Sequence, residues 1–218
     1  MPLSRTLGEL AADLQVRLGF GSAGAGAGVN LALMYNFLYN GQLQLYWSAD
    51  WKGCRTYVTK TLPNAATRID YPDEIHPERI SGISVNYNGV WTPYIDEGID
   101  PEAYTNQENA GPPSRVDYYN QIEFFPLSDR VYSVRIFGQK PLTRFTQSTD
   151  QTTLDPDLVF LHALANAKAH YKHSDAQFYA DQLSSLLTGV RSRNWSKRVF
   201  DHQPRSTPLP KPQVVGRI

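Results

Sequence analysis

The sequence predicts an α+β fold: a helical bundle from N- and C-terminal helices with an inserted antiparallel β domain and an extended C-terminal tail. Two observations lead to this prediction. Apolar residues recur at helical spacing near both ends of the chain, whereas the middle alternates between apolar and polar residues with a period of two. We expect a discontinuous helical domain of residues 1–48 and 151–200, a β domain of residues 49–150 and a basic, proline-rich tail of residues 201–218.

The first helix is predicted by a capping box, because Thr6 and Glu9 lie three residues apart at the start of an apolar stripe that stops at Gly19. A second helix is predicted over about residues 29–47, and its interior Gly41 costs about 1 kcal/mol relative to alanine. One face of the second helix comprises Leu31, Met34, Tyr35, Leu38, Gln42 and Leu45.

The tract between these helices, residues 19–28, begins with G-x-G-x-x-G, the pattern of a dinucleotide-binding turn. Such a turn follows a strand and precedes an acid, about twenty residues on, that binds the ribose. Here a helix precedes the glycines and the first acid is Asp50. We therefore interpret the tract as a flexible connector and expect no cofactor.

Residues 18–49 contain no charged residue, and the stretch is long enough to cross a bilayer. Amide side chains are costly in hydrocarbon, whereas neighbouring protein can hydrogen-bond them. We therefore expect this helix to pack against protein and not to span a membrane. The amides are those of Asn30, Asn36, Asn40, Gln42 and Gln44.

Short antiparallel strands are predicted between residues 51 and 140. Asn88 and Gly89 separate two of them and predict a hairpin with a type I′ turn, since both residues tolerate positive φ. Residues 95–115 are acidic and rich in turn residues, so we expect a long solvated loop there. The period-two segments are RTYVTKTL, TRIDY, RISGISVNY, RVDYYNQIEFF and VYSVRIFG.

An αα-hairpin is predicted after residue 150. Asp155 supplies an N-cap and Pro156 occupies the first helical position of one helix. An amphipathic stretch follows after Ser174 and includes Phe178 and Tyr179.

Charge is segregated along the chain although the formal net charge is zero. Residues 191–218 hold seven basic residues against the single acid Asp201, so this stretch carries +6 and the remainder carries −6. The prolines predict an extended tail, and Val214, Val215 and Ile218 lie beyond them as an apolar tip of the sequence. A basic segment with an apolar tip predicts docking onto a partner.

The sequence contains no pattern of residues that predicts an enzyme. The single cysteine, Cys54, excludes an internal disulfide framework and is expected to be an inert thiol. His170 and His173 lie three residues apart on a predicted helix, so a metal-dependent enzyme built on them and an acid is one alternative. A third ligand is not identifiable, and we expect no catalytic residue, no metal and no cofactor.

A further alternative is a monomeric β-rich binding module that recognises a glycan or host ligand through tyrosine and tryptophan. Aromatic residues are also ordinary strand formers and interface anchors, so packing is the interpretation that we favour for them. The aromatic residues in question are Tyr57, Tyr71, Tyr87, Trp91, Tyr94, Tyr118 and Tyr119.

The order of elements, with the segments LALMYNFLYNGQLQLYW and DPDLVFLHALANAKAHY, resembles the head-to-tail adaptor proteins of tailed bacteriophages, the group that includes tail tubular protein A of short-tailed phages. The resemblance covers about residues 6–200, and Asp175, Tyr179 and Leu183 extend the second segment. It implies a dodecameric ring of identical subunits, with the portal protein above, a tail or nozzle protein below and a channel for DNA. It also implies a place in the virion.

Two sets of contact residues follow. Adaptors of this family commonly insert their C-terminal tail into the portal. The resemblance therefore implies portal binding by Arg198, Arg205, Pro208, Pro210, Lys211, Pro212, Val214, Val215, Arg217 and Ile218. The uncharged helix beside alanine-rich helices predicts a subunit interface of Leu31, Tyr35, Leu38, Leu45, Trp47, Phe178 and Tyr179. The lone cysteine and the acid-containing start MPLSRTLGELAADL predict synthesis in a cytoplasm, here that of the host bacterium.

Overall fold

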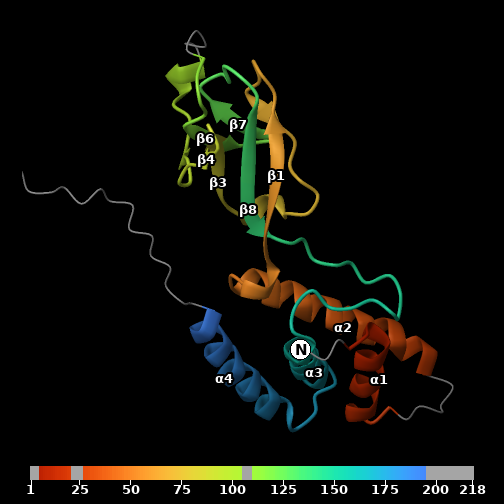
Figure 1. Ribbon diagram of the computed structural model, residues 1–218. Helices are drawn as coiled ribbons and strands as arrows, with labels where there is room; N and C mark the ends of the chain where they lie inside the picture. Colours follow the sequence, from red (N-terminus) through yellow and green to blue (C-terminus); the bar gives the residue numbers. More distant parts are fainter. Residues whose placement is uncertain (1–4, 21–26, 105–109, 195–218) are drawn as a thin grey trace, which may run out of the picture.

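The computed structural model describes residues 5–20, 27–104 and 110–194. Within these ranges the chain has four α-helices at one end and two four-stranded β-sheets at the other (Figure 1). The predicted α+β class is therefore confirmed. The predicted tail lies outside the described residues, as does most of the glycine-rich connector.

The first two helices are α1 (Leu7–Arg17) and α2 (Ala27–Ser48). The predicted capping box is present: the Thr6 hydroxyl accepts from the Glu9 amide at 3.3 Å, and the Glu9 carboxylate accepts from the Thr6 amide at 2.9 Å. Because a helix precedes the glycine tract, the dinucleotide-binding pattern lacks its preceding strand.

Gly41 lies inside α2 without breaking it. A Cβ atom at this position would lie 3.3 Å from Nδ1 of His162 and 3.4 Å from the carbonyl oxygen of Val159. Both residues belong to the third helix, so the glycine lets two helix backbones approach closely. This close packing offsets the free-energy cost of the low helix propensity of glycine.

The C-terminal helices are α3 (Pro156–His170) and α4 (Ala176–Asn194), and they confirm the predicted αα-hairpin. The Asp155 carboxylate caps α3 by accepting from the amides of Asp157 at 3.0 Å and Leu158 at 3.3 Å.

A buried lysine fixes the turn between α3 and α4. Lys168 is 6% exposed, and its ammonium donates to the Asp175 carboxylate at 2.5 Å and lies 4.9 Å from the centre of the Tyr179 ring. The hydrogen bond from Lys168 lowers the pKa of Asp175.

The first sheet has the strand order β1-β8-β3-β4 and consists of β1 (Arg55–Leu62), β8 (Tyr132–Gln139), β3 (Ile80–Tyr87) and β4 (Val90–Trp91). The second has the order β2-β7-β6-β5 and consists of β2 (Arg68–Ile69), β7 (Ile122–Phe125), β6 (Arg115–Tyr118) and β5 (Asp96–Glu97). Short 3₁₀ helices span Lys52–Cys54, Pro77–Arg79 and Pro101–Tyr104.

The predicted hairpin is confirmed. Asn88 and Gly89 have φ of 52° and 86°, and they connect β3 to β4 with Tyr87 opposite Val90. Both central residues therefore have the positive φ that a type I′ turn needs.

Two predictions for the β region are corrected. The pairing is not antiparallel throughout, because β5 runs parallel to β6 with Asp96 opposite Arg115. Residues 95–115 are not wholly a solvated loop, since they include β5 and the buried Ile99, which is 7% exposed. The Gly98 amide donates to the Val116 carbonyl at 2.8 Å, and this bond continues the pairing beyond the strand.

Each end of the molecule has its own apolar core. After β8 the chain returns to the helices, where Leu142 and Phe145 pack against the helical core. The amide side chain of Gln42, fully buried in α2, donates to the Thr143 carbonyl at 3.3 Å and accepts from the Thr153 amide at 2.8 Å. This buried amide is thus bonded by protein, as the sequence led us to expect.

Candidate assembly surfaces

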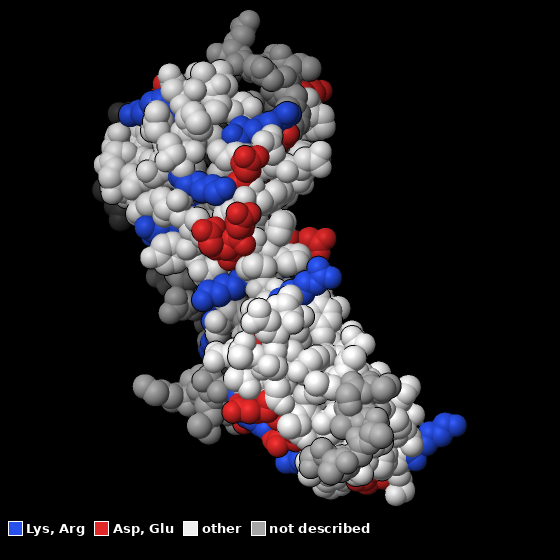
Figure 2. Space-filling view, turned by 90° about the vertical axis from the view of Figure 1, so that its right-hand side faces the viewer, with Lys and Arg blue, Asp and Glu red and all other residues white. Residues whose placement is uncertain are grey.

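The helices present an uncharged surface. α2 contains no charged residue, and Figure 2 shows a broad area without charged side chains over the helical part of the molecule. Trp47, near the end of α2, is 45% exposed. An aromatic residue at the edge of an uncharged surface is typical of protein–protein contacts.

The structure divides the predicted subunit-interface residues into three groups. Leu38 and Leu45 are fully buried in the chain's own core. Leu31, Tyr35 and Tyr179 are half-buried against that core. Trp47 and Phe178 are exposed, and Phe178 on α4 is 65% accessible. Trp47 and Phe178 are therefore the most accessible of these seven residues.

The outer side of α4 carries apolar residues that the described fold does not cover. Phe178 touches Tyr179 edge-on, with ring centres 5.4 Å apart, and Leu186, two helical turns further along, is 42% exposed. On the inner side, Leu183 and Leu187 pack against the helical core. α4 therefore has apolar residues on two sides, and the described part of the chain covers only one of them.

A junction that the sequence did not reveal joins the helices to the sheets. The Arg79 guanidinium donates to the carbonyl oxygens of Tyr46 at 2.7 Å and Ala49 at 2.6 Å. It also lies 4.9 Å from the centre of the Tyr46 ring and 5.4 Å from that of Trp47. The Tyr46 hydroxyl donates to the Lys140 carbonyl at 3.0 Å. Since α2 has no basic residue in its last turn, these end carbonyls need a donor from elsewhere.

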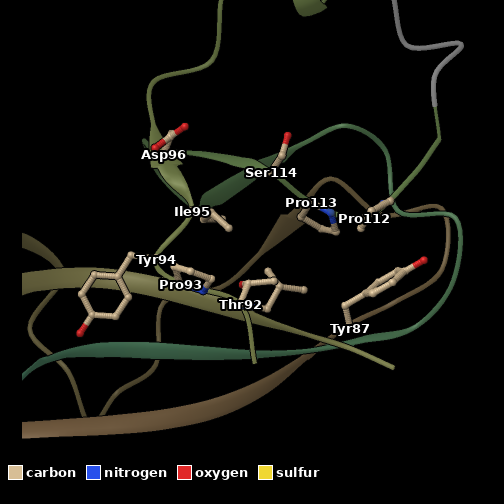
Figure 3. A pocket seen from close by; sticks show the side chains of 10 residues that line it. Tyr87, Thr92, Pro93, Tyr94, Ile95, Asp96, Pro112, Pro113 and Ser114 are labelled. Atoms are coloured by element: carbon tan, nitrogen blue, oxygen red, sulfur yellow. The ribbon is translucent and has the colours of Figure 1, made fainter. Parts of the chain in front are cut away.

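The β region has a groove between its two sheets (Figure 3). Its volume is about 440 Å³, and Tyr87 and Tyr94 stand at its two ends, as Figure 3 shows. We call this feature the tyrosine groove. Its lining comprises Val85, Tyr87, Thr92, Pro93, Tyr94, Ile95, Asp96, Pro112, Pro113 and Ser114.

The aromatic residues considered for glycan binding do not form one surface. Tyr57 and Tyr94 both contact Phe137, with ring centres 5.8 and 5.2 Å away, and Arg135 lies over the rings of Tyr57 and Trp91. Tyr71 and Tyr118 instead pack against the β core, and burial raises the pKa of both hydroxyls.

The described structure brings His173 near Asp175 but does not gather the residues considered for catalysis into one site. His170 contacts the rings of Phe37 and Tyr171, whereas Asp175 is paired with Lys168. In the described part of the chain, no group of three or more His, Cys, Asp or Glu residues could hold a metal ion. Cys54 is buried, and burial raises the pKa of its thiol.

The portal-binding residues expected in the tail, from Arg198 to Ile218, lie outside the described residues. None of the described helices is long and apolar enough to cross a membrane.

The exposed aromatic residues of the helices are of the kind found in protein–protein contacts. The family model of the SU10 adaptor protein matches residues 5–206, and the chain belongs to this family of phage head-to-tail adaptors. No curated protein matches the chain. Membership makes the chain a bacteriophage adaptor that assembles with other components of the virion.

Proposed function

We propose that the chain is the ring-forming head-to-tail adaptor of a tailed phage. Identical subunits, twelve in the family it resembles, form a ring between the portal protein and the tail or nozzle protein. The match over residues 5–206 supports this function most directly. In this role the chain binds proteins, performs no catalysis and surrounds a channel through which DNA passes without sequence readout.

Two unlike surfaces on the helices support a closed ring. A subunit in such a ring contacts its two neighbours through different surfaces, because the contact is head to tail. One surface is the uncharged face of α2, which ends at Trp47, and the other is the outer side of α4 with Phe178 and Leu186. We propose that α2 of one subunit meets α4 of the next.

The tail supplies the contact with the portal. Residues 191–218 carry +6, which favours an acidic binding site and a fast encounter. Prolines restrict the free tail, so it loses less conformational entropy on docking than a flexible segment would. The apolar residues Val214, Val215 and Ile218 then anchor the tip.

Deletion of residues 201–218 tests this role. We expect portal affinity to fall at least tenfold while the chain stays folded, because both apolar cores of the described residues form without residues 201–218. Portal binding is measured by surface plasmon resonance and stability by urea titration.

The matched control is a full-length chain in which residues 201–218 stand in scrambled order, which keeps their length and charge. The proposal requires this chain to bind as weakly as the deletion. Unchanged portal affinity after the deletion would refute docking through the tail. Wild-type affinity of the scrambled chain would show that the charge of the tail, and not its sequence, determines portal binding.

A further inference from the structure

None of the contacts proposed above involves the tyrosine groove, although it is a sizeable apolar hollow on the surface. Tyr87 is 39% and Tyr94 is 50% exposed, so both rings are open to a ligand. Their positions are fixed: Arg130 lies 5.1 Å from the centre of the Tyr87 ring, and the Tyr94 ring packs on the backbone of Gly82 and beside Phe137. Rings that are fixed and exposed make a preorganised binding surface.

The groove is poorly suited to an added β-strand. Pro93, Pro112 and Pro113 in its lining have no backbone N–H. The backbone amides of Ile95 and Ser114 already donate within the chain, to Ile83 and Phe125, each at 2.9 Å. A strand needs free backbone donors and acceptors, and the groove offers few.

A polyproline segment has the opposite requirements. It has no internal hydrogen bonds, and it docks in grooves lined by aromatic rings. The chain itself contains such a segment, Thr-Pro-Leu-Pro-Lys-Pro at residues 207–212, in which every second residue is proline. Tyrosine rings at both ends of an apolar, proline-lined groove match this chemistry.

Charge also matches. Asp96 is the only charged residue among the described residues that line the groove; it stands opposite Arg115 of β6, and Glu97 follows it on the exposed strand β5. The proline segment contains Lys211 and no acid, and Arg205 lies just before it. With these acids on β5 and Arg130 over the ring of Tyr87, the charges along the groove differ, and this difference favours one direction for the basic segment.

The tail is longer than the strand that leads to the groove. Fourteen residues lead from the end of α4 at Asn194 to Pro208, and a polyproline chain of that length spans about 43 Å at ~3.1 Å per residue. The groove lies near the far end of β3, a strand about 27 Å long at ~3.4 Å per residue. In Figure 1, α4 rises toward the sheets and ends on their side of the helical bundle.

We propose that the tyrosine groove binds residues 207–212 of the same chain, so that the tail of the unassembled subunit lies along the β region. On assembly, the portal would compete with the groove for the tail, and this competition rests on the function proposed above. Binding of the tail in the groove does not depend on that function.

Crosslinking in the full-length chain tests the proposal. The photoreactive residue p-benzoylphenylalanine replaces Leu209, the chain is irradiated at high dilution, and the crosslinked peptides are identified by mass spectrometry. We expect intramolecular crosslinks to the peptides that contain Tyr87, Tyr94 or Pro113. Crosslinks only to the helices, or only between chains, would overturn the proposal.

Two comparisons show whether the groove itself is responsible. Replacing both groove tyrosines, Tyr87→Ala and Tyr94→Ala, is expected to lower the crosslink yield at least tenfold, whereas the control Tyr119→Ala, at an exposed position outside the groove, leaves it unchanged. A synthetic peptide of residues 204–214 in excess should suppress the crosslink in the otherwise native chain, and it serves if the double variant does not fold. A yield that neither treatment lowers would contradict groove binding.

The outcome is independent of the portal. A chain that crosslinks in the groove but does not bind a portal would refute the proposed adaptor contact alone. A chain that binds the portal through its tail but never crosslinks in the groove would refute the present inference alone.

Discussion

At the scale of single residues, Arg79 connects the two ends of the molecule. Its guanidinium bonds two carbonyls at the end of α2 and lies over the Tyr46 ring, although the residue itself precedes β3. Hydrogen bonds that involve a charged group are worth about 1.5–3 kcal/mol each in proteins. Arg79 is therefore a main contributor to the junction, together with the bond from the Tyr46 hydroxyl to the Lys140 carbonyl.

Replacing Arg79 with alanine is expected to lower the free energy of unfolding by about 2 to 3 kcal/mol, because two carbonyls lose their donor. Urea titration followed by circular dichroism measures the loss. The exposed Arg144→Ala variant is the matched control and should differ from wild type by less than about 0.5 kcal/mol. A loss of that small size at Arg79 would show that the junction does not depend on the guanidinium.

His162 gives the fold a dependence on pH. It is 9% exposed in α3, and burial lowers its pKa below the ordinary value. The folded chain keeps the imidazole neutral, whereas the unfolded chain protonates it at pH about 6.5. The unfolded state thus binds more protons as the pH falls from about 7 to 5, and stability declines over that range.

We expect His162→Gln to flatten the pH dependence of stability between about pH 7 and pH 5, since glutamine does not titrate. Thermal unfolding at a series of pH values in matched buffers measures the slope. Asp175, whose pKa is lowered, acts in a separate window: its contribution is complete above about pH 4 and is lost as the pH falls through its folded pKa. An equally steep decline in the glutamine variant would contradict the assignment to His162.

At the scale of elements, the contact between α2 and α3 depends on the small size of Gly41. A Cβ atom there would meet Nδ1 of His162 at 3.3 Å, which is tight but tolerable if the ring moves by a few tenths of an ångström. Longer side chains would push the helices apart.

Two variants of Gly41 separate helix propensity from packing. The free energy of unfolding of Gly41→Ala is expected to lie within about 1 kcal/mol of the wild-type value, because the gain in helix propensity offsets the tight contact. Gly41→Leu should lose about 1–3 kcal/mol, the usual cost of overpacking a core. Both are measured by urea unfolding, and a leucine variant as stable as wild type would show that the helices are not in close contact here.

The elements that the sequence predicted well are those whose signals lie within a few residues. Thr6 with Glu9, Asn88 with Gly89, and Asp155 with Pro156 each define a helix start or a turn by local chemistry. The parallel pairing of β5 with β6 has no such signal, because its partners lie about twenty residues apart and one strand has only two residues.

The candidate sites show the same limit. Helical periodicity marked Leu38 and Leu45 as one apolar face, but periodicity does not say whether the chain itself or another molecule covers that face. The reach of Arg79 to α2 and the grouping of Tyr87 with Pro113 also depend on the tertiary fold. Neither can be predicted from local sequence patterns.

At the scale of the whole molecule, the proposed ring requires the outer side of α4. We expect Phe178→Glu to abolish ring formation in the presence of the portal, because a charge in the centre of a subunit contact is costly to desolvate. Phe178 is 65% exposed, so the isolated chain should unfold as wild type does.

Negative-stain imaging of the variant mixed with portal reports ring formation. The control is Val131→Glu, at a residue that is 62% exposed and lies beside the first sheet, away from the helices. Complete rings in the Phe178 variant would exclude this side of α4 from the contact between subunits.

The way the chain enters and leaves the sheets has a consequence for how such proteins diversify. Arg55 stands opposite Gln139 at the ends of β1 and β8, and the Lys140 amide donates to the Cys54 carbonyl at 2.8 Å. The 85 residues from 55 to 139 therefore begin and end at the same place. Recombination could replace this segment with one of different length without changing the distance between residues 54 and 140. The helices and the sheets can therefore evolve independently of each other.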